Sequence, residues 1–94
     1  LDDGQRQRSL GLYQWLRAGA QRATEPGATP EAVTEAAWQH MRRAGLAPEY
    51  VVVRRAGDLE PVNDLAGPRV LLAAAHVDQV RLIDNLELNP GAAG

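Results

Sequence analysis

The sequence lacks cysteine, phenylalanine and lysine, and its aromatic content is only 4%. Without cysteine, the chain has no disulfide, no thiolate metal ligand and no cysteine nucleophile, as is usual in a reducing compartment. No apolar run reaches the roughly 18 residues of a transmembrane helix, and the polar start LDDGQRQR is unlike a signal peptide. We therefore expect a cytoplasmic protein with no membrane partner.

Charge and length restrict the possible functions further. The 10 basic residues, all arginine, are outnumbered by 12 acidic ones, so no nucleic-acid partner is expected. The 94 residues suffice for a single domain, residues 1–94, in which we expect 1–88 to be folded and 89–94 to be a flexible tail. Because the chain starts at Leu1 without an initiator methionine, we also expect it to be a piece of a longer protein.

A first helix is predicted at the N-terminus. Asp2 or Asp3 is a good N-cap, and Gln5 then completes a capping box with Asp2. Glycines weaken this helix by about 1 kcal/mol each relative to alanine, so packing must hold it together. The core-facing stripe is predicted to be Tyr13, Leu16 and Ala20, widened by Leu12 and Ser9. The weakening glycines are Gly4, Gly11 and Gly19.

A second helix is predicted from Pro30 to about Ala44. Thr29 precedes it as N-cap, and Gly45 follows it where a glycine normally ends a helix. The apolar stripe of this helix is predicted to be Val33, Ala37, either His40 or Met41, and Ala44. His40 therefore lies on this stripe or next to it. It has no second ligand four residues away, so it is interpreted as a packed histidine and not as a metal ligand.

The densest apolar stretch, 69–85, predicts two strands joined by a tight reversal. The unbroken apolar run Val70 to Ala75 is typical of a central strand, and the reversal is placed at His76 to Gln79. Within it, only Asp78 readily accepts an unusual backbone angle. After the reversal, the chain alternates through Val80, Leu82 and Leu86.

A further strand, Glu49 to Arg54, precedes a long connection from Arg55 to Pro68. Parallel pairing of the last two strands would need a much longer crossover, so we predict an antiparallel sheet in chain order. The fold class is therefore α+β, with two helices packed on one face of a three-stranded antiparallel sheet. From the connection, Leu59, Val62 and Leu65 are expected to reach the core.

The residues contain no chemical motif of an enzyme. There is no glycine-rich phosphate loop, no Ser-His-Asp arrangement and no pair of metal ligands, because both histidines are isolated. His76 is a candidate acid or base only in the sense that any exposed histidine is. Asp58 and Glu60 flank Leu59 in an irregular loop and are interpreted as solvated carboxylates.

The order of these elements resembles the C-terminal domain of the pantothenate synthetase (pantoate-β-alanine ligase) family. The resemblance runs from Leu1, just after the position of the family's Ser-Ser-Arg-Asn segment, to Leu88. At the reversal the family usually has a glycine, whereas this sequence has Val77-Asp78-Gln79. The most specific segments are Tyr50 to Arg54, Asp58-Leu59 with Pro61, the strand ending in Ala74-Ala75, and Arg81 to Asn85.

The resemblance implies an ATP-dependent, AMP-forming ligase. Such an enzyme adenylates pantoate with ATP and passes the pantoyl group to β-alanine, giving pantothenate, AMP and pyrophosphate, with magnesium assisting. The chain would be its C-terminal lid domain, partnered by an N-terminal nucleotide-binding domain of the same chain, and the full-length protein is expected to be a homodimer. The family's catalytic and ATP-binding residues lie upstream of Leu1. No catalytic, ATP-binding, substrate-binding or metal residue is therefore assigned here, and the isolated fragment should be inactive and bind neither ATP nor magnesium.

Two interpretations remain open from the sequence. The alternative to a ligase domain is a stand-alone α+β protein-interaction module without catalysis, and the residues upstream of Leu1 would decide. The polar pair Asp84 and Asn85 interrupts an apolar strand and is taken as a structural or interdomain candidate. If either side chain is buried, we expect it to bind backbone groups of the 55–68 connection, because an unpaired buried polar group costs about 1 to 3 kcal/mol.

Overall fold

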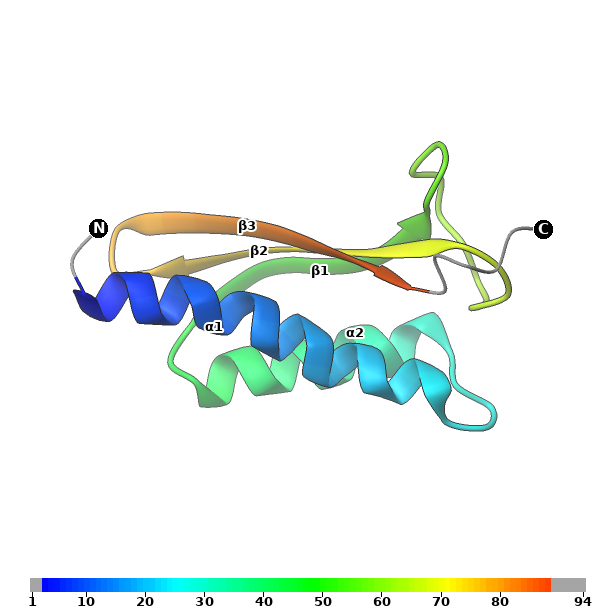
Figure 1. Ribbon diagram of the computed structural model, residues 1–94, viewed down its shortest axis with the longest axis horizontal. Helices are drawn as coiled ribbons and strands as arrows, with labels where there is room; N and C mark the ends of the chain where they lie inside the picture. The colour runs from blue at the N-terminus through cyan, green and yellow to red at the C-terminus, as the bar shows by residue number, and fades with distance from the viewer. Residues whose placement is uncertain (1–2, 89–94) are drawn as a thin grey trace.

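The computed structural model describes the backbone of residues 3–88 and the side chains of residues 12–88. It has two layers, a pair of helices and a sheet, and both helices cover the same face of the sheet (Figure 1). This arrangement confirms the predicted α+β class. The elements are α1 (Asp3–Ala20), the 3-10 helix η1 (Gln21–Thr24), α2 (Pro30–Arg43), β1 (Ala47–Arg55), β2 (Arg69–Val77) and β3 (Val80–Leu88).

The three strands form one antiparallel sheet in the order β1-β2-β3. The predicted strand order and the central position of β2 are confirmed. Alternate residues of β2 have different surroundings: Leu71, Ala73 and Ala75 belong to the hydrophobic core under the helices, whereas Ala74 points to the opposite face. The unbroken apolar run is therefore the strand that has a neighbour on both sides.

The β2–β3 hairpin is tighter than predicted. Val77 pairs with Val80, so the reversal consists only of Asp78 and Gln79, and the assignment of His76 and Val77 to the turn was wrong. Val77 is 2% exposed, and burying it favours continuing the strand to the last possible residue. Asp78 has φ 55°, which confirms it as the residue that takes the unusual angle, at a turn position usually filled by glycine.

The buried stripe of α1 differs from the prediction at one residue. Leu16 is fully buried and Ala20 packs against the core as predicted, but Tyr13 is 42% exposed. Leu12, which was predicted to widen the stripe, is buried and takes the core position. An α-helix turns by about 100° per residue, so the line through Leu12, Leu16 and Gly19 leaves Tyr13 on its border. The predicted capping box of Asp2 and Gln5 lies outside the side chains described.

The predicted limits of α2 are confirmed. The Thr29 side chain accepts a hydrogen bond from the backbone N–H of Ala32 at 3.2 Å, as an N-cap does. Gly45 follows the C-cap with φ 88°, a left-handed conformation that glycine adopts without steric cost. The predicted stripe is buried at Val33, Ala37 and Met41, with Met41 and not His40 at the core position.

The two helices touch where their side chains are smallest. A Cβ atom added to Gly19 would lie 2.6 Å from the Cβ of Ala37 and 2.9 Å from its backbone nitrogen. Those distances are shorter than a non-bonded carbon contact allows. Gly19 is therefore required for the close approach of α1 to α2, which the sequence alone presented only as a weak point of the helix.

The connection between β1 and β2 is partly packed and partly exposed. Val62 and Leu65 pack against the core, as predicted. Leu59 does not reach the core, contrary to the prediction, because it lies in a tight turn that points away from it and is 54% exposed. The turn is closed by two backbone hydrogen bonds, from Arg55 N–H to Glu60 O at 2.9 Å and from Leu59 N–H to Arg55 O at 2.8 Å.

One hydrophobic cluster lies between the helices and the sheet. Among the described side chains, no polar or charged residue is buried and no buried polar side-chain atom lacks a partner. Within residues 3–88, neither α1 nor α2 combines the length and apolar character needed to cross a membrane. The predicted tail, 89–94, lies outside the described residues. The cluster consists of Leu12, Leu16, Val33, Ala37, Met41, Leu46, Val53, Leu71, Ala73, Ala75, Val77, Leu82 and Leu88.

Candidate functional site

The sheet face that the helices do not cover, called here the outer face, carries the residues that alternate with the core positions. Leu82 and Leu88 of β3, for example, are in the core, so Ile83 between them points outward. The register places Tyr50, Ala74 and Ile83 in one row across the three strands. The outer face comprises Tyr50, Val52 and Arg54 of β1, Val70, Leu72, Ala74 and His76 of β2, and Arg81, Ile83, Asn85 and Glu87 of β3.

An ion cluster lies at the hairpin end of the outer face. His76 and Arg81 are direct cross-strand partners, and Glu49 reaches both from an irregularity in the β1 register between Pro48 and Tyr50. Arg81 donates from Nε to Glu49 Oε1 at 3.0 Å and from Nη2 to Oε2 at 2.9 Å, while His76 Nε2 lies 2.9 Å from Oε1. Such a two-pronged contact is among the stronger hydrogen-bonded ion pairs.

These contacts fix the charge of Glu49. Hydrogen bonds from Arg81, and then from His76, lower the pKa of Glu49 to about 2, and Glu49 in turn raises the pKa of Arg81. A carboxyl group with so low a pKa stays ionised near neutral pH and is poorly matched to general acid-base catalysis. The cluster therefore provides a fixed, internally compensated charge arrangement. Sequence analysis singled out His76 but missed Glu49, 27 residues earlier, because only the β1–β2 register brings them together.

Asp84 and Asn85, the candidates from the sequence, point to opposite faces of the sheet. Asp84 is half-buried on the helix side opposite Ala73, and its Oδ1 accepts a hydrogen bond from the backbone N–H of Asn85 at 2.8 Å. Asn85 is exposed on the outer face. Neither side chain is fully buried. A hydrogen bond to backbone groups of the 55–68 connection was expected only for a buried side chain, so that expectation does not apply to either residue. Their structural or interdomain role remains a prediction.

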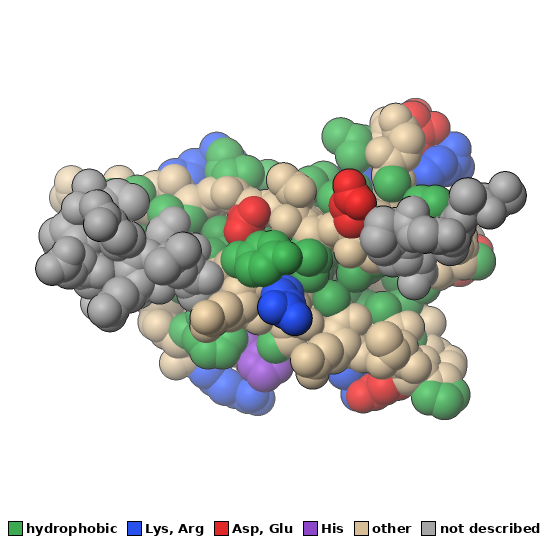
Figure 2. Space-filling model, in the orientation of Figure 1, with side chains coloured by type: hydrophobic (Ala, Val, Ile, Leu, Met, Phe, Trp, Pro, Cys, Tyr) green, Lys and Arg blue, Asp and Glu red, His purple; other side chains and the backbone are tan. Residues whose placement is uncertain are grey.

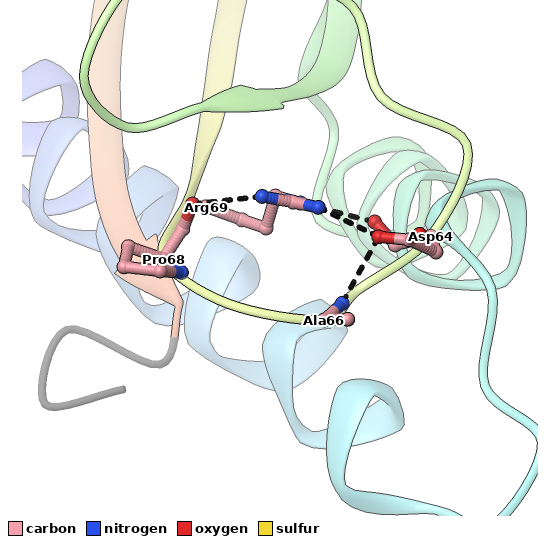
Figure 3. A network of polar contacts seen from close by, with 4 residues as sticks. All are labelled: Asp64, Ala66, Pro68 and Arg69. Atoms are coloured by element: carbon pink, nitrogen blue, oxygen red, sulfur yellow. Dashed lines mark hydrogen bonds and ion pairs between the residues drawn. The ribbon is translucent and has the colours of Figure 1, made fainter. Parts of the chain in front are cut away.

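A different residue ties the connection to the sheet. Arg69, at the start of β2, donates from Nε to the Asp64 carbonyl oxygen at 3.1 Å and from Nη2 to Asp64 Oδ1 at 2.6 Å (Figure 3). Its Nη1 donates to the Pro68 carbonyl oxygen at 3.1 Å, and Asp64 Oδ1 also accepts from the N–H of Ala66 at 3.1 Å. The hydrogen bond from Arg69, more than that from Ala66, lowers the pKa of Asp64. The Arg69 side chain is only 11% exposed, so it serves the fold and is not displayed to a ligand.

The remaining candidates from the sequence have structural surroundings. His40 stacks on Trp15, with ring centroids 6.0 Å apart and planes 5° from parallel, which agrees with its interpretation as a packed histidine. Asp58 and Glu60 are exposed, as predicted. Asp58 does have partners: Oδ2 accepts from Arg55 Nη1 at 3.0 Å and Oδ1 accepts from the Glu60 N–H at 3.1 Å.

No metal centre is assembled in the described part of the chain. Across those residues, no three side chains of the metal-binding types His, Asp and Glu converge on one point. On the side shown in Figure 2, hydrophobic side chains gather between the two layers, and arginine and acidic side chains are spread over the view, some of them next to one another. Some arginines are already paired within the chain, as Arg22 is with Glu25 at 2.6 Å.

Comparison with known proteins gives a consistent match. A family model described as pantoate-beta-alanine ligase matches residues 1–87. Pantothenate synthetase from Shewanella loihica is 37% identical over 86 residues, which cover 92% of this chain and 30% of that protein. The enzyme of the same name from Stutzerimonas stutzeri is 52% identical over 46 residues, 49% of this chain and 16% of that protein.

The fold is also that of a solved structure. The crystal structure of pantothenate synthetase from Thermus thermophilus superposes with a TM-score of 0.81 and 25% sequence identity, and the match covers 96% of this chain. The chain spans 33% of that structure and 30% or less of the two curated relatives. Because the family model matches almost the full length of this chain, the chain belongs to the pantoate-beta-alanine ligase family.

Proposed function

We propose that this chain is the C-terminal domain of a ligase that joins pantoate to β-alanine with ATP. The reaction passes through a pantoyl adenylate and yields pantothenate, AMP and pyrophosphate, with magnesium offsetting phosphate charge. The observation that carries the proposal is the family match over residues 1–87. It is supported by the fold, which superposes on one third of a pantothenate synthetase.

In this proposal the described residues do not perform the chemistry. The catalytic and ATP-binding groups belong to a nucleotide-binding domain that precedes Leu1, in a cytoplasmic and homodimeric parent protein. The role left to this domain is that of a lid. An acyl adenylate is exposed to hydrolysis, so a cover that closes over it excludes water while the second substrate reacts. The single hydrophobic cluster between the helices and the sheet suits a body that moves as one piece.

The proposal is tested on the parent protein. Incubated with ATP, magnesium, pantoate and β-alanine, it should form pantothenate, AMP and pyrophosphate in equal amounts. The same protein truncated before Leu1 is the control, and it should form pantothenate far more slowly because its adenylate is left uncovered. If the intact parent forms neither pantothenate nor AMP from these substrates, the ligase assignment is wrong, and the stand-alone interaction module is favoured.

Within this function, Asp84 and Asn85 are proposed as structural or interdomain residues. Asp84→Ala and Asn85→Ala are to be made both in this chain and in the parent. A structural role lowers the melting temperature of the chain itself, and we expect this for Asp84, whose side chain holds the Asn85 N–H. A residue that contacts the other domain would instead leave this stability unchanged and reduce ligase turnover.

A further inference from the structure

The edge of β1 that faces away from β2 is only partly covered. β1 has a single neighbour within the sheet, β2, and the 55–68 connection crosses its other side only at its end. There the Arg55 N–H donates to Glu60 O at 2.9 Å, on the edge away from β2. Main-chain N–H and C=O groups alternate in direction along a strand, so those of Val51 and Val53 point to the same edge.

The middle of this edge has no partner within residues 3–88. None of the main-chain hydrogen bonds described there joins Val51 to a group on the side away from β2. Natural proteins usually protect such an edge with proline, charge or a covering loop. Here Pro48 stands near the start of β1, and the bridge from Arg54 to Pro61 covers its end. The segment between them is an unpaired edge, which is a template on which another strand can pair.

A groove of about 260 Å³ lies beside the open edge. β1 forms one wall, and the other is formed by the start of α2, where Glu31 and Thr34 line the groove. The start of α2 and the end of β1 lie at the same end of the molecule (Figure 1). An extended segment in this groove can therefore bond to the strand edge while its side chains pack against the helix. This arrangement is known from peptide recognition by β-strand addition.

Two charged residues of opposite sign line the groove. Among the described side chains, neither Glu31 nor Arg54 belongs to an ion pair. Arg54 lies on the outer face, whereas Glu31 belongs to the helical layer. Successive side chains of an added strand point to opposite faces, so an acidic residue that faces Arg54 has a neighbour that faces Glu31. The groove therefore matches a segment with an acidic and a basic residue next to each other.

The size and lining of the groove favour a single strand over a folded body. Apart from the two charged residues and Thr34, the lining is valine and proline, which suits β-branched side chains. A volume of about 260 Å³ holds a few side chains and no helix. A second copy of this chain that paired through its own β1 would bring its α2 against the α2 that stands beside this edge. An extended segment of another protein meets no such obstacle.

We propose that the open edge of β1 and the groove beside it bind an extended segment of another protein by β-strand addition. The main chain of the segment bonds to Val51 and Val53. Its acidic side chain pairs with Arg54, the adjacent basic side chain pairs with Glu31, and β-branched side chains fill the rest of the groove. The site lies on the sheet edge and does not rest on the proposed function.

The probe for this site is a library of random heptapeptides displayed on phage and selected on the immobilised 94-residue chain. The strongest binder is synthesised with a fluorescent label, and its affinity is measured by anisotropy. Thr34→Trp fills the groove from α2 and leaves the sequence of β1 unchanged. Arg42→Trp is the matched control, because Arg42 is an exposed residue of the same helix that does not line the groove. Thermal unfolding checks that both variants are folded.

Strand addition predicts that Thr34→Trp weakens binding of the selected peptide at least about tenfold, while Arg42→Trp changes it less than about twofold. The amide resonance of Val51 should shift when the peptide binds. A library without a binder, or a binder that tolerates Thr34→Trp, would overturn the proposal. The parent protein should bind the same peptide within about threefold of this affinity. A much lower affinity would show that the groove is already occupied there, which also contradicts the proposal.

The charge pattern has its own test. Glu31→Arg should weaken the selected peptide about threefold or more, since an exposed ion pair is lost and like charges then meet. Replacing the basic residue of the peptide with glutamate should recover this loss in the Glu31→Arg variant and weaken binding to the wild-type chain. A loss that is not recovered would show that the segment does not lie between Glu31 and Arg54, and the proposal would be wrong.

Discussion

Leu59 is the residue at which local preference and observed structure disagree most. Its φ of 61° and 54% exposure mean that the side chain gains little from folding while the backbone is strained. We expect Leu59→Gly to raise the free energy of unfolding by about 0.5 to 1 kcal/mol. The variant relieves the backbone strain, and part of this gain is offset because glycine increases the conformational entropy of the unfolded chain. Urea unfolding of the 94-residue chain measures this change. Leu59→Ala is the control, which keeps a Cβ at the same φ and should leave stability nearly unchanged.

Glu49 predicts a pH dependence of a defined sign. Its pKa is lowered from 4.5 in the unfolded chain to about 2 in the fold. The contribution of Glu49 to stability is therefore complete above pH 4.5 and is lost as the pH falls from 4.5 towards 2. Over this pH range, the Glu49→Gln variant should lose less stability than the wild-type chain does. Thermal unfolding at a series of pH values measures the difference, and Glu60→Gln on the exposed turn is the control. Parallel curves for wild type and Glu49→Gln would contradict the ion cluster.

At the scale of elements, the contact between α1 and α2 depends on the absence of one side chain. In an isolated helix, Gly19→Ala would stabilise by about 1 kcal/mol. Here the added Cβ would meet Ala37 at 2.6 Å, and overpacking of this kind costs about 1 to 3 kcal/mol. We expect a net loss of up to about 2 kcal/mol in the free energy of unfolding, measured by urea unfolding.

The double variant Gly19→Ala with Ala37→Gly separates packing from propensity. It moves the small residue to the other helix, so it should recover part of the loss, whereas independent sites would show additive losses. Gly57→Ala is a further control, because a Cβ at that position meets no atom within 4 Å. A stabilising effect of Gly19→Ala alone would show that the two helices can move apart at little cost.

At the scale of the whole molecule, the arrangement of the charged side chains bears on nucleotide binding. No metal-binding triad forms among the described residues, and Arg22, Arg55, Arg69 and Arg81 have acidic partners within the chain. We therefore expect the 94-residue chain to have no measurable ligase activity and no tight site for ATP with magnesium. Titration calorimetry checks this prediction, with the parent protein as the positive control. Micromolar binding by the chain alone would place part of the active site in this domain.

The sequence by itself determined the elements and their order. Thr29 and Gly45 mark the ends of α2, the run Val70 to Ala75 marks the central strand, and a connection as short as 76–79 forces the hairpin to be antiparallel. These are local signals, because caps, apolar periodicity and loop length act over a few residues. The family resemblance was carried in the same way, by short segments such as Arg81 to Asn85.

Only the tertiary structure decided which residues meet. Glu49 joins His76 and Arg81, and Gly19 meets Ala37, through register and helix packing that no short window of sequence contains. Tyr13 and Leu59 were assigned to the core because periodicity and hydrophobicity favour burial, but the sheet covers only part of the helix circumference and the Arg55–Glu60 turn directs Leu59 outward. The outer face was likewise undefined until the helices were found on one side. An amphipathic strand specifies that it has two faces, whereas which of them is covered depends on where the rest of the chain packs.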